Sequence, residues 1–240
     1  MDNGFELLAS DHGIVLGLTL TTVVAMLLAR RHFRPPADEP YRYALASVLV
    51  LAEISGWIGA MWQGNLVFPF HLCDLAAAAT TWALLLPRHH KACLLAYFWG
   101  LAGSVHAIVT PDLSVSVRSF WGAQFFLTHA SIVWGATYLA ATGRVRPNWP
   151  SLVWVWLMSN LYALAAGLLN WSLGTNYGYL ADKPLHPSLL DYLGPWPYYI
   201  LGLEIVGVIS LLFWYAPLAI VRARRPELSR RDQSGPDSHN

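Results

Sequence analysis

Long apolar segments alternate with short polar ones along the chain, and the apolar segments have the length of membrane-spanning helices. A helix needs about 20 apolar residues to cross a bilayer. The polar breaks carry turn-forming residues, as in "RPPADEP" and "GRVRPNWP". The span that starts at residue 70 is short, so it either crosses with little tilt or begins earlier, near Asn65. The pattern predicts seven spans, at residues 13–29, 43–63, 70–86, 92–110, 119–141, 151–170 and 196–217.

Composition agrees with this pattern. The chain of 240 residues is 55% hydrophobic and only 12% charged, whereas a typical soluble domain is about 25% charged. We therefore expect an all-α fold, a polytopic seven-helix transmembrane bundle over residues 1–221. The segment 222–240 is polar and basic, and we expect a disordered cytoplasmic tail there. Nothing in this composition indicates a nucleic-acid partner, and it leaves the oligomeric state open.

The basic residues are distributed unevenly between the two sides of a seven-span chain. Thirteen of the fifteen Lys and Arg residues fall on one side, and only Arg118 and Lys183 fall on the other. Cytoplasmic loops carry an excess of Lys and Arg. The distribution therefore predicts that the N-terminus is outside and the C-terminus is inside.

Polar and ionisable residues gather in the outer half of the predicted bundle. Such groups are costly in hydrocarbon, by about 2.5–3.5 kcal/mol each on insertion scales. Their convergence from several helices indicates a polar cavity that opens outward, near the extracytoplasmic loop 171–195, and argues against a transport path through both halves. The residues expected to approach one another there are His71, Asp74, His106, Asp112, Asn170 and Asn176.

Four further polar residues keep two interpretations each. Cys73 lies on a stripe of small residues, where a thiol is either a packing group or a nucleophile. His129 either hydrogen-bonds a neighbouring helix or takes part in chemistry. Glu53 and Glu204 lie nearer the middle of the membrane, where they either share a proton or each bind a polar neighbour. Cys93 has no polar residues near it in its apolar segment and is interpreted as structural.

Five motifs together resemble the YwaF family of bacterial integral membrane proteins. They are "PFHLCDL", "FWGLAGSVHAIVTPDL", "FFLTHASIV", "NYGYLADKP" and "SLLDYLGPWPYYI", and they cover about residues 65–200 in the order of that family. The resemblance implies a bacterial cell-membrane protein. That family is distantly similar to a eukaryotic membrane family that transfers polyunsaturated acyl chains onto ether lysophospholipids.

The resemblance implies a lipid acyltransferase that works through an acyl-enzyme on Cys73, with His129 as the base. A thiolate is the nucleophile in acyl transfer, and a nearby imidazole can generate it. Asp74 or His71 would orient the imidazole, and Asn176 would hold the oxyanion. The substrate would be a membrane phospholipid or lysophospholipid, and no cofactor is expected. From the predicted helix limits, Cys73 lies about 5 Å and His129 about 13 Å below the outer edge.

Two other classes of function remain open from the sequence. A metal-dependent lipid hydrolase could draw on the His, Cys and Asp residues, although the last two spans contain no His for an HxxxH pair. A lipid-binding or small-molecule sensor protein would use the same outer cavity without a nucleophile. Retention of activity after the loss of Cys73 would favour either of these over the acyl-enzyme.

Overall fold

The computed structural model describes residues 5, 7, 9–33, 37–65, 68–186 and 188–233, with side chains as far as Ala223. The described chain is all-helical, with seven α-helices, three short 3-10 helices and no strand. One α-helix corresponds to each predicted span, so the all-α class and the number of helices are confirmed. The α-helices are α1 (Ser10–Ala29), α2 (Glu39–Trp62), α3 (Leu72–Leu85), α4 (His90–Val109), α5 (Phe120–Ala141), α6 (Trp149–Leu173) and α7 (Tyr198–Gln233).

Five of these helices are long and apolar enough to cross a membrane, namely α1, α2, α4, α6 and α7. The other two are special cases. Helix α3 has 14 residues, about 21 Å at 1.5 Å per residue, which is shorter than the hydrocarbon core of about 30 Å. Helix α5 has 22 residues but includes polar side chains such as Gln124, Thr128 and His129. Many of its residues are buried, so its polar groups face protein.

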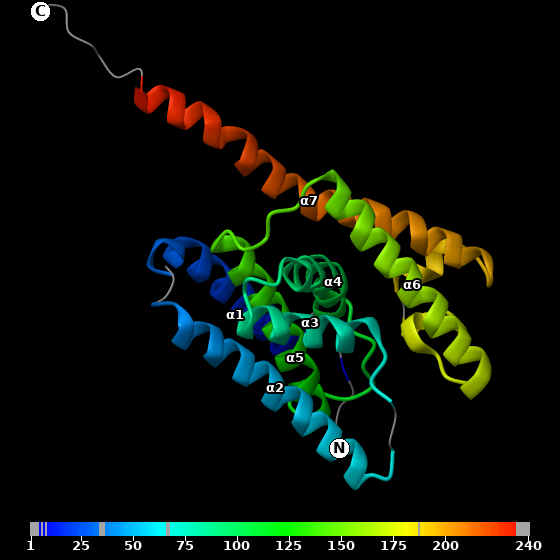
Figure 1. Cartoon of the computed structure of the whole chain (residues 1–240). Coiled ribbons are helices and arrows are strands. Elements are labelled where there is room, and N and C mark those ends of the chain that lie inside the picture. The colour runs from blue at the N-terminus through cyan, green and yellow to red at the C-terminus, as the bar shows by residue number, and fades with distance from the viewer. Residues whose placement is uncertain are drawn as a thin grey trace, which may run out of the picture.

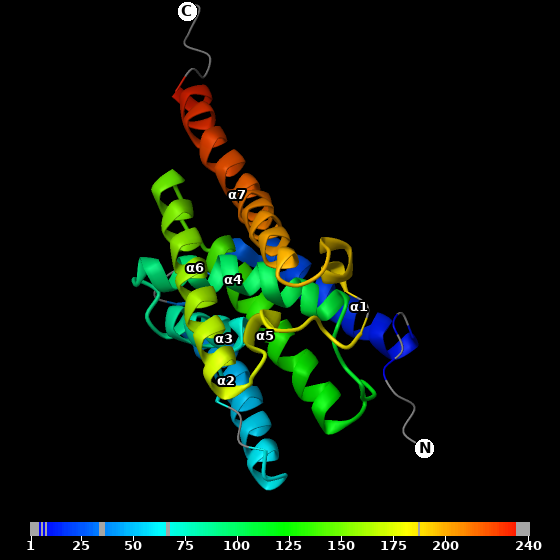
Figure 2. The ribbon, with the colours of Figure 1, turned by 90° about the vertical axis from the view of Figure 1, so that its right-hand side faces the viewer.

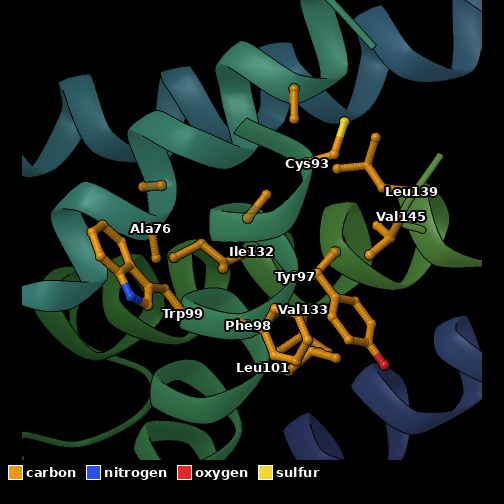
Figure 3. Packing of buried hydrophobic residues seen from close by; sticks show 14 of the residues in the cluster. Ala76, Cys93, Tyr97, Phe98, Trp99, Leu101, Ile132, Val133, Leu139 and Val145 are labelled. Carbon is orange, nitrogen blue, oxygen red and sulfur yellow. The ribbon is translucent and has the colours of Figure 1, made fainter. Parts of the chain in front are cut away.

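Helices α1 to α5 form a compact group, and α6 and α7 lie together along one side of it (Figures 1 and 2). The buried core joins α4 and α5, with α3 packed across both. Figure 3 shows Phe98 and Trp99 of α4 beside Ile132 of α5 in this core. Helix α7 is attached to α4 by a hydrogen bond from Tyr97 Oη to the carbonyl of Trp214, at 2.9 Å.

The two ends of the bundle differ in their contacts. At one end, here called the basic end, Arg42 of α2 donates to the carbonyl of Leu84 at the end of α3, at 2.6 Å. At the opposite end, here called the loop end, Asp11 of α1 forms a two-bond ion pair with Arg118, with distances of 2.6 and 2.8 Å. Helices α2 and α3 therefore run in opposite directions, and α1 and α5 both start at the loop end, as the seven-span pattern predicts.

Helix α7 extends beyond the span predicted for it. The apolar pattern predicts an end near residue 217, and the helix continues to Gln233, through the predicted boundary at residue 221. Residues 234–240 of the predicted tail lie outside the described residues, as does Pro187 of the loop before α7. Cys73 and Cys93 are both free thiols.

Candidate functional site

The start of α3 is fixed by its own first residues. His71 is extended, with φ −67° and ψ 155°, and its backbone N–H donates to the Asp74 carboxylate at 2.8 Å. A carboxylate in the first turn also complements the helix dipole. Pro69 precedes this cap and disfavours helix at Phe68. The helix therefore begins at Leu72, and an earlier start near Asn65 is wrong.

The close packing of α3 on α5 sets their register. A Cβ added at Gly135 would lie 2.4 Å from Thr80 Cγ2, so the two helices approach closely at this point. Both helices run from the loop end to the basic end, and both rise about 1.5 Å per residue. Cys73 lies seven residues before Thr80 on α3, and His129 lies six residues before Gly135 on α5. The two residues therefore lie toward the loop end of two helices that are in contact.

The imidazole of His129 is oriented by its own helix. Its Nδ1 lies 2.7 Å from the carbonyl oxygen of Phe125. A carbonyl can only accept, so Nδ1 carries the hydrogen and Nε2 keeps its lone pair. The side chain is 6% exposed and its ring lies 4.1 Å from the ring of Phe125. His129 is thus held in the tautomer that a general base requires.

Cys73 lies in the first turn of α3 and is half-buried. Its backbone N–H is one of the first donors of α3, which have no acceptor within the helix itself. No direct hydrogen bond joins the Cys73 thiol to His129 among the hydrogen bonds recorded for the described chain. The thiol therefore lies in the first turn of α3, near the carboxylates of Asp74 and Glu53.

A cavity of about 450 Å³ lies between α2 and α3, and its lining runs along α3 from Asp74 to Leu85. Glu53 and Asp74 are its two carboxylates, and Trp57 and Trp82 contribute aromatic surface. The rest of the wall is aliphatic or small, apart from Thr81. Glu53 is therefore a neighbour of Asp74, next to Cys73. Glu204 lies elsewhere, on α7, where its carboxylate accepts hydrogen bonds from Trp156 and Asn160 of α6.

The loop between α6 and α7 packs on the loop end of α3. Tyr177 Oη donates to the carbonyl of Phe68 at 2.8 Å, and its ring lies 5.2 Å from that of His71. Asn170 holds this part of the loop, because its Oδ1 accepts from the Tyr177 N–H at 2.7 Å and its Nδ2 donates to the Tyr177 carbonyl at 3.0 Å. Asn170 therefore positions the loop that covers His71.

Asp112 anchors the same loop further along. Its carboxylate accepts from Tyr179 Oη at 3.0 Å and from His186, through Nδ1 at 2.6 Å and the backbone N–H at 3.2 Å. Burial opposes ionisation of Asp112, but the hydrogen bonds from His186 and Tyr179 lower its pKa below the usual value. Burial raises the pKa of Tyr179, and the charges of Asp112 and of an ionised Cys73 raise it further. Tyr179 is therefore a neutral donor near the thiol.

Sequence reasoning missed Tyr179 and His186. The sequence did hold a signal for them, because a half-buried carboxylate such as Asp112 needs a hydrogen-bond partner, and the long loop at the same end of the bundle contains residues that can be that partner.

Two predicted residues lie apart from this cluster. His106 is exposed and its Nδ1 lies 2.8 Å from the carbonyl of Ala102 on its own helix. Asn176 is occupied within the loop, where its side chain bonds the backbone of residues 181 and 182.

The structure thus brings together only some of the residues predicted to form the outer cavity. His71 lies beside Tyr177 and Tyr179, and Tyr179 connects to Asp112. The side chain of Asn176 has partners in its own loop. Within the ranges that the structure describes, no group of three or more His, Cys, Asp or Glu residues is arranged to hold a metal ion.

Comparison with known families matches residues 7–215 to the model of the TMEM164 family, and the chain belongs to that family. The comparison gives this family and not the YwaF family, while the membrane character that the resemblance implied is confirmed. Together with the five long apolar helices, it identifies an integral membrane protein. Comparisons with curated proteins and with solved structures find no match.

Proposed function

We propose that this member of the TMEM164 family is a membrane-embedded lipid acyltransferase with Cys73 as the nucleophile and His129 as the general base. The observation that supports the proposal is the close approach of α3 and α5 at Thr80 and Gly135, because these two packed helices carry Cys73 and His129 toward the same end. In this proposal the thiol proton passes to His129 directly or through one water molecule.

The chemistry requires a base in the correct tautomer and a donor for the oxyanion. Hydrogen bonding of His129 Nδ1 to Phe125 leaves Nε2 to accept the thiol proton. The N–H groups in the first turn of α3 are candidate oxyanion donors in addition to Asn176. The nucleophile and these donors then belong to one helix turn, so they are fixed relative to each other.

The proposed reaction proceeds in two balanced steps. The Cys73 sulfur attacks the ester carbonyl of a phospholipid and its proton moves to His129. The C–O bond breaks, a thioester forms, and the departing lysophospholipid oxygen takes the proton. The hydroxyl of an acceptor lysophospholipid then attacks the thioester, gives its proton to His129, and regenerates the thiol. Water in place of the acceptor would give hydrolysis. The cavity beside Asp74 has mainly apolar walls, which suits an acyl chain.

The orientation in the membrane is part of the proposal. Arg30, Arg88 and Arg144 belong to loops or helix ends at the basic end of the bundle, and the positive-inside rule assigns that end to the cytoplasm. The N-terminus would then lie outside and the C-terminus inside. Cys73 would be reached from the outer half of the membrane, below the loop that carries Tyr177 and Tyr179. The bacterial cell membrane is the membrane we propose.

Acyl transfer by variants of the purified chain tests this function. The assay supplies a phospholipid with a labelled acyl chain and an unlabelled lysophospholipid acceptor. Cys73→Ser should lower the rate at least about 100-fold, because an alcohol is far less readily ionised than a thiol, and His129→Ala should lower it at least about 100-fold through loss of the base.

Cys93→Ser is the matched control. Cys93 is fully buried in the core, with its Sγ 3.6 Å from the carbonyl of Pro87, and it lies away from the α3 first turn. A serine can donate to the same carbonyl, so this variant should keep the wild-type rate. Full transfer activity in a folded Cys73→Ser protein would exclude the acyl-enzyme. Lipid binding without turnover in the wild type would favour a lipid-binding or sensor protein instead.

A further inference from the structure

A second cavity, separate from the α3 site, opens along the surface of the bundle between α1, α4, α5 and α7. Its volume is about 550 Å³. The floor is formed by buried side chains of the core, including Tyr97, Leu101 and Val133, which lie beside one another in Figure 3. Leu20 of α1 forms part of the outer wall and is 64% exposed. We call this cavity the α1–α7 groove.

The α1–α7 groove has the length of a lipid chain. On α1 its lining runs from Leu16 to Arg30, which is about 21 Å at 1.5 Å per residue. One leaflet of the hydrocarbon core is about 15 Å deep, half of the usual 30 Å. A whole helix of the same length, about 10 Å across, would need a channel several times larger than 550 Å³. The groove therefore fits an extended chain better than a protein helix.

Charge is found at only one end of the groove. Arg30 lines the basic end, and the described lining residues include no carboxylate. Arg146 donates to the carbonyl of Gly143, another lining residue, at 2.9 Å. Arg222 directly follows the lining residue Val221 on α7. An apolar groove that ends among arginines is complementary to a lipid with a negatively charged headgroup.

We propose that an anionic phospholipid occupies the α1–α7 groove, with an acyl chain along α1 and α4 and its phosphate near Arg30 and Arg222. The lipid comes from the leaflet that meets the basic end of the bundle. It fills the space between α1 and α7 and thereby fixes α7 against α4. This site is independent of the proposed acyl transfer, because the groove contains neither Cys73 nor His129.

Native mass spectrometry of the purified full chain tests the proposal. The protein is released from detergent after incubation with phosphatidylglycerol or with phosphatidylcholine. We expect retention of phosphatidylglycerol and at least about fivefold weaker retention of phosphatidylcholine, since an arginine near an anionic headgroup contributes about 1 kcal/mol. Arg30→Gln should weaken phosphatidylglycerol binding about fivefold. The matched control is Arg88→Gln, an exposed arginine at the same end of the bundle that does not line the groove.

A second pair of variants tests the apolar part of the groove. Leu20→Trp should fill the space and lower the bound fraction of either lipid several-fold. Leu18→Trp is the control, because Leu18 is 62% exposed on the same helix but does not line the groove. Both changes are on a surface wall and should leave the fold intact, which an unchanged gel-filtration profile verifies. Equal retention of the two lipids, or equal effects within either pair of variants, would overturn the proposal. Competition by water-soluble glycerol phosphate would show a phosphate site without lipid, and a second copy retained in place of lipid would show a protein interface.

Discussion

At the residue scale, a buried carboxylate joins three elements at the basic end of the bundle. Asp38 is 1% exposed, accepts from Tyr138 Oη at 2.6 Å, and pairs with Arg144. Arg42 Nε lies 3.7 Å away, and the same guanidinium caps α3 through Leu84. Burial opposes ionisation, but the hydrogen bond from Tyr138 and the two arginines lower the pKa of Asp38. Asp38 is thus ionised and paired at neutral pH.

Asp38→Asn should destabilise the protein by about 3 kcal/mol or more, because it leaves two largely buried arginines without their carboxylate. The midpoint of thermal unfolding in detergent measures this. Glu39→Gln is the matched control, because Glu39 is the adjacent acid, its side chain is 53% exposed, and it lies 3.5 Å from Arg42. An exposed pair contributes at most about 1 kcal/mol. Equal shifts for the two variants would contradict the role assigned to Asp38.

The Asp38 cluster shows what charge patterns in the sequence can and cannot predict. Arg42 and Arg144 contribute to the excess of basic residues on one side, and the structure places both at one end of the bundle as expected. Their burial and their shared carboxylate depend on α2 and α5 meeting at this point. That meeting brings together residues 106 positions apart, which no local pattern in the sequence specifies.

At the element scale, the position of α3 depends on its close packing against α5. Gly135→Ala should separate the two helices, because its Cβ would lie 2.4 Å from Thr80 Cγ2. We expect a loss of about 1–3 kcal/mol in stability, together with reduced acyl transfer as Cys73 moves away from His129. In the double variant with Thr80→Ala, the obstructing methyl group is absent, so much of the stability and of the acyl-transfer activity should be restored.

Gly103→Ala is the control for this pair. An added Cβ at Gly103 meets no atom within 4 Å, and alanine favours helix over glycine by about 1 kcal/mol. This variant should therefore be at least as stable as the wild type. A Gly135→Ala protein with wild-type stability and activity would show that the close approach of α3 and α5 is not required.

The loop before α7 depends on Asp112 in a similar way. Asp112→Asn removes the charge that accepts hydrogen bonds from His186 and Tyr179, and should cost about 1 kcal/mol. Hydrogen exchange at neutral pH should accelerate in residues 174–186. Asp182→Asn, an exposed change in the same loop, should have no such effect.

The pH dependence of this contribution has a defined sign. The pKa of Asp112 is lower in the folded protein than its unfolded value of about 3.9. The stabilisation is therefore present above pH 4 and is lost as the pH falls through the folded pKa. The difference in unfolding midpoint between the wild type and Asp112→Asn should shrink below pH 4. A difference that grows on acidification would contradict the assignment.

At the scale of the whole molecule, hydropathy was sufficient to predict the helices. Each apolar segment became one helix because a chain in lipid must satisfy its backbone hydrogen bonds within each span. The candidate site was harder to predict, because the packing of α3 depends on a tertiary contact between Thr80 and Gly135, and the partners of Asp112 come from a loop about 70 residues away. Local sequence patterns do not encode such contacts.

The orientation of the whole chain is testable without activity. A reporter fused after Asn240 should be cytoplasmic, because the basic end of the bundle carries most of the Lys and Arg residues. Two fusions measure the location of residue 240: one reporter is active only in the cytoplasm, and the other is active only outside it. An extracytoplasmic position for residue 240 would reverse the topology and place Cys73 in the inner half of the membrane.

The central claim is a covalent acyl-enzyme on Cys73, and the most direct measurement is the mass of the peptide that carries this residue. The purified chain is incubated with a phospholipid donor in the absence of an acceptor, quenched in acid and digested. We predict an added acyl mass on Cys73 that hydroxylamine removes, as it removes thioesters, and that is absent from His129→Ala. An unmodified Cys73 in a protein that nevertheless transfers the acyl chain would contradict the acyl-enzyme.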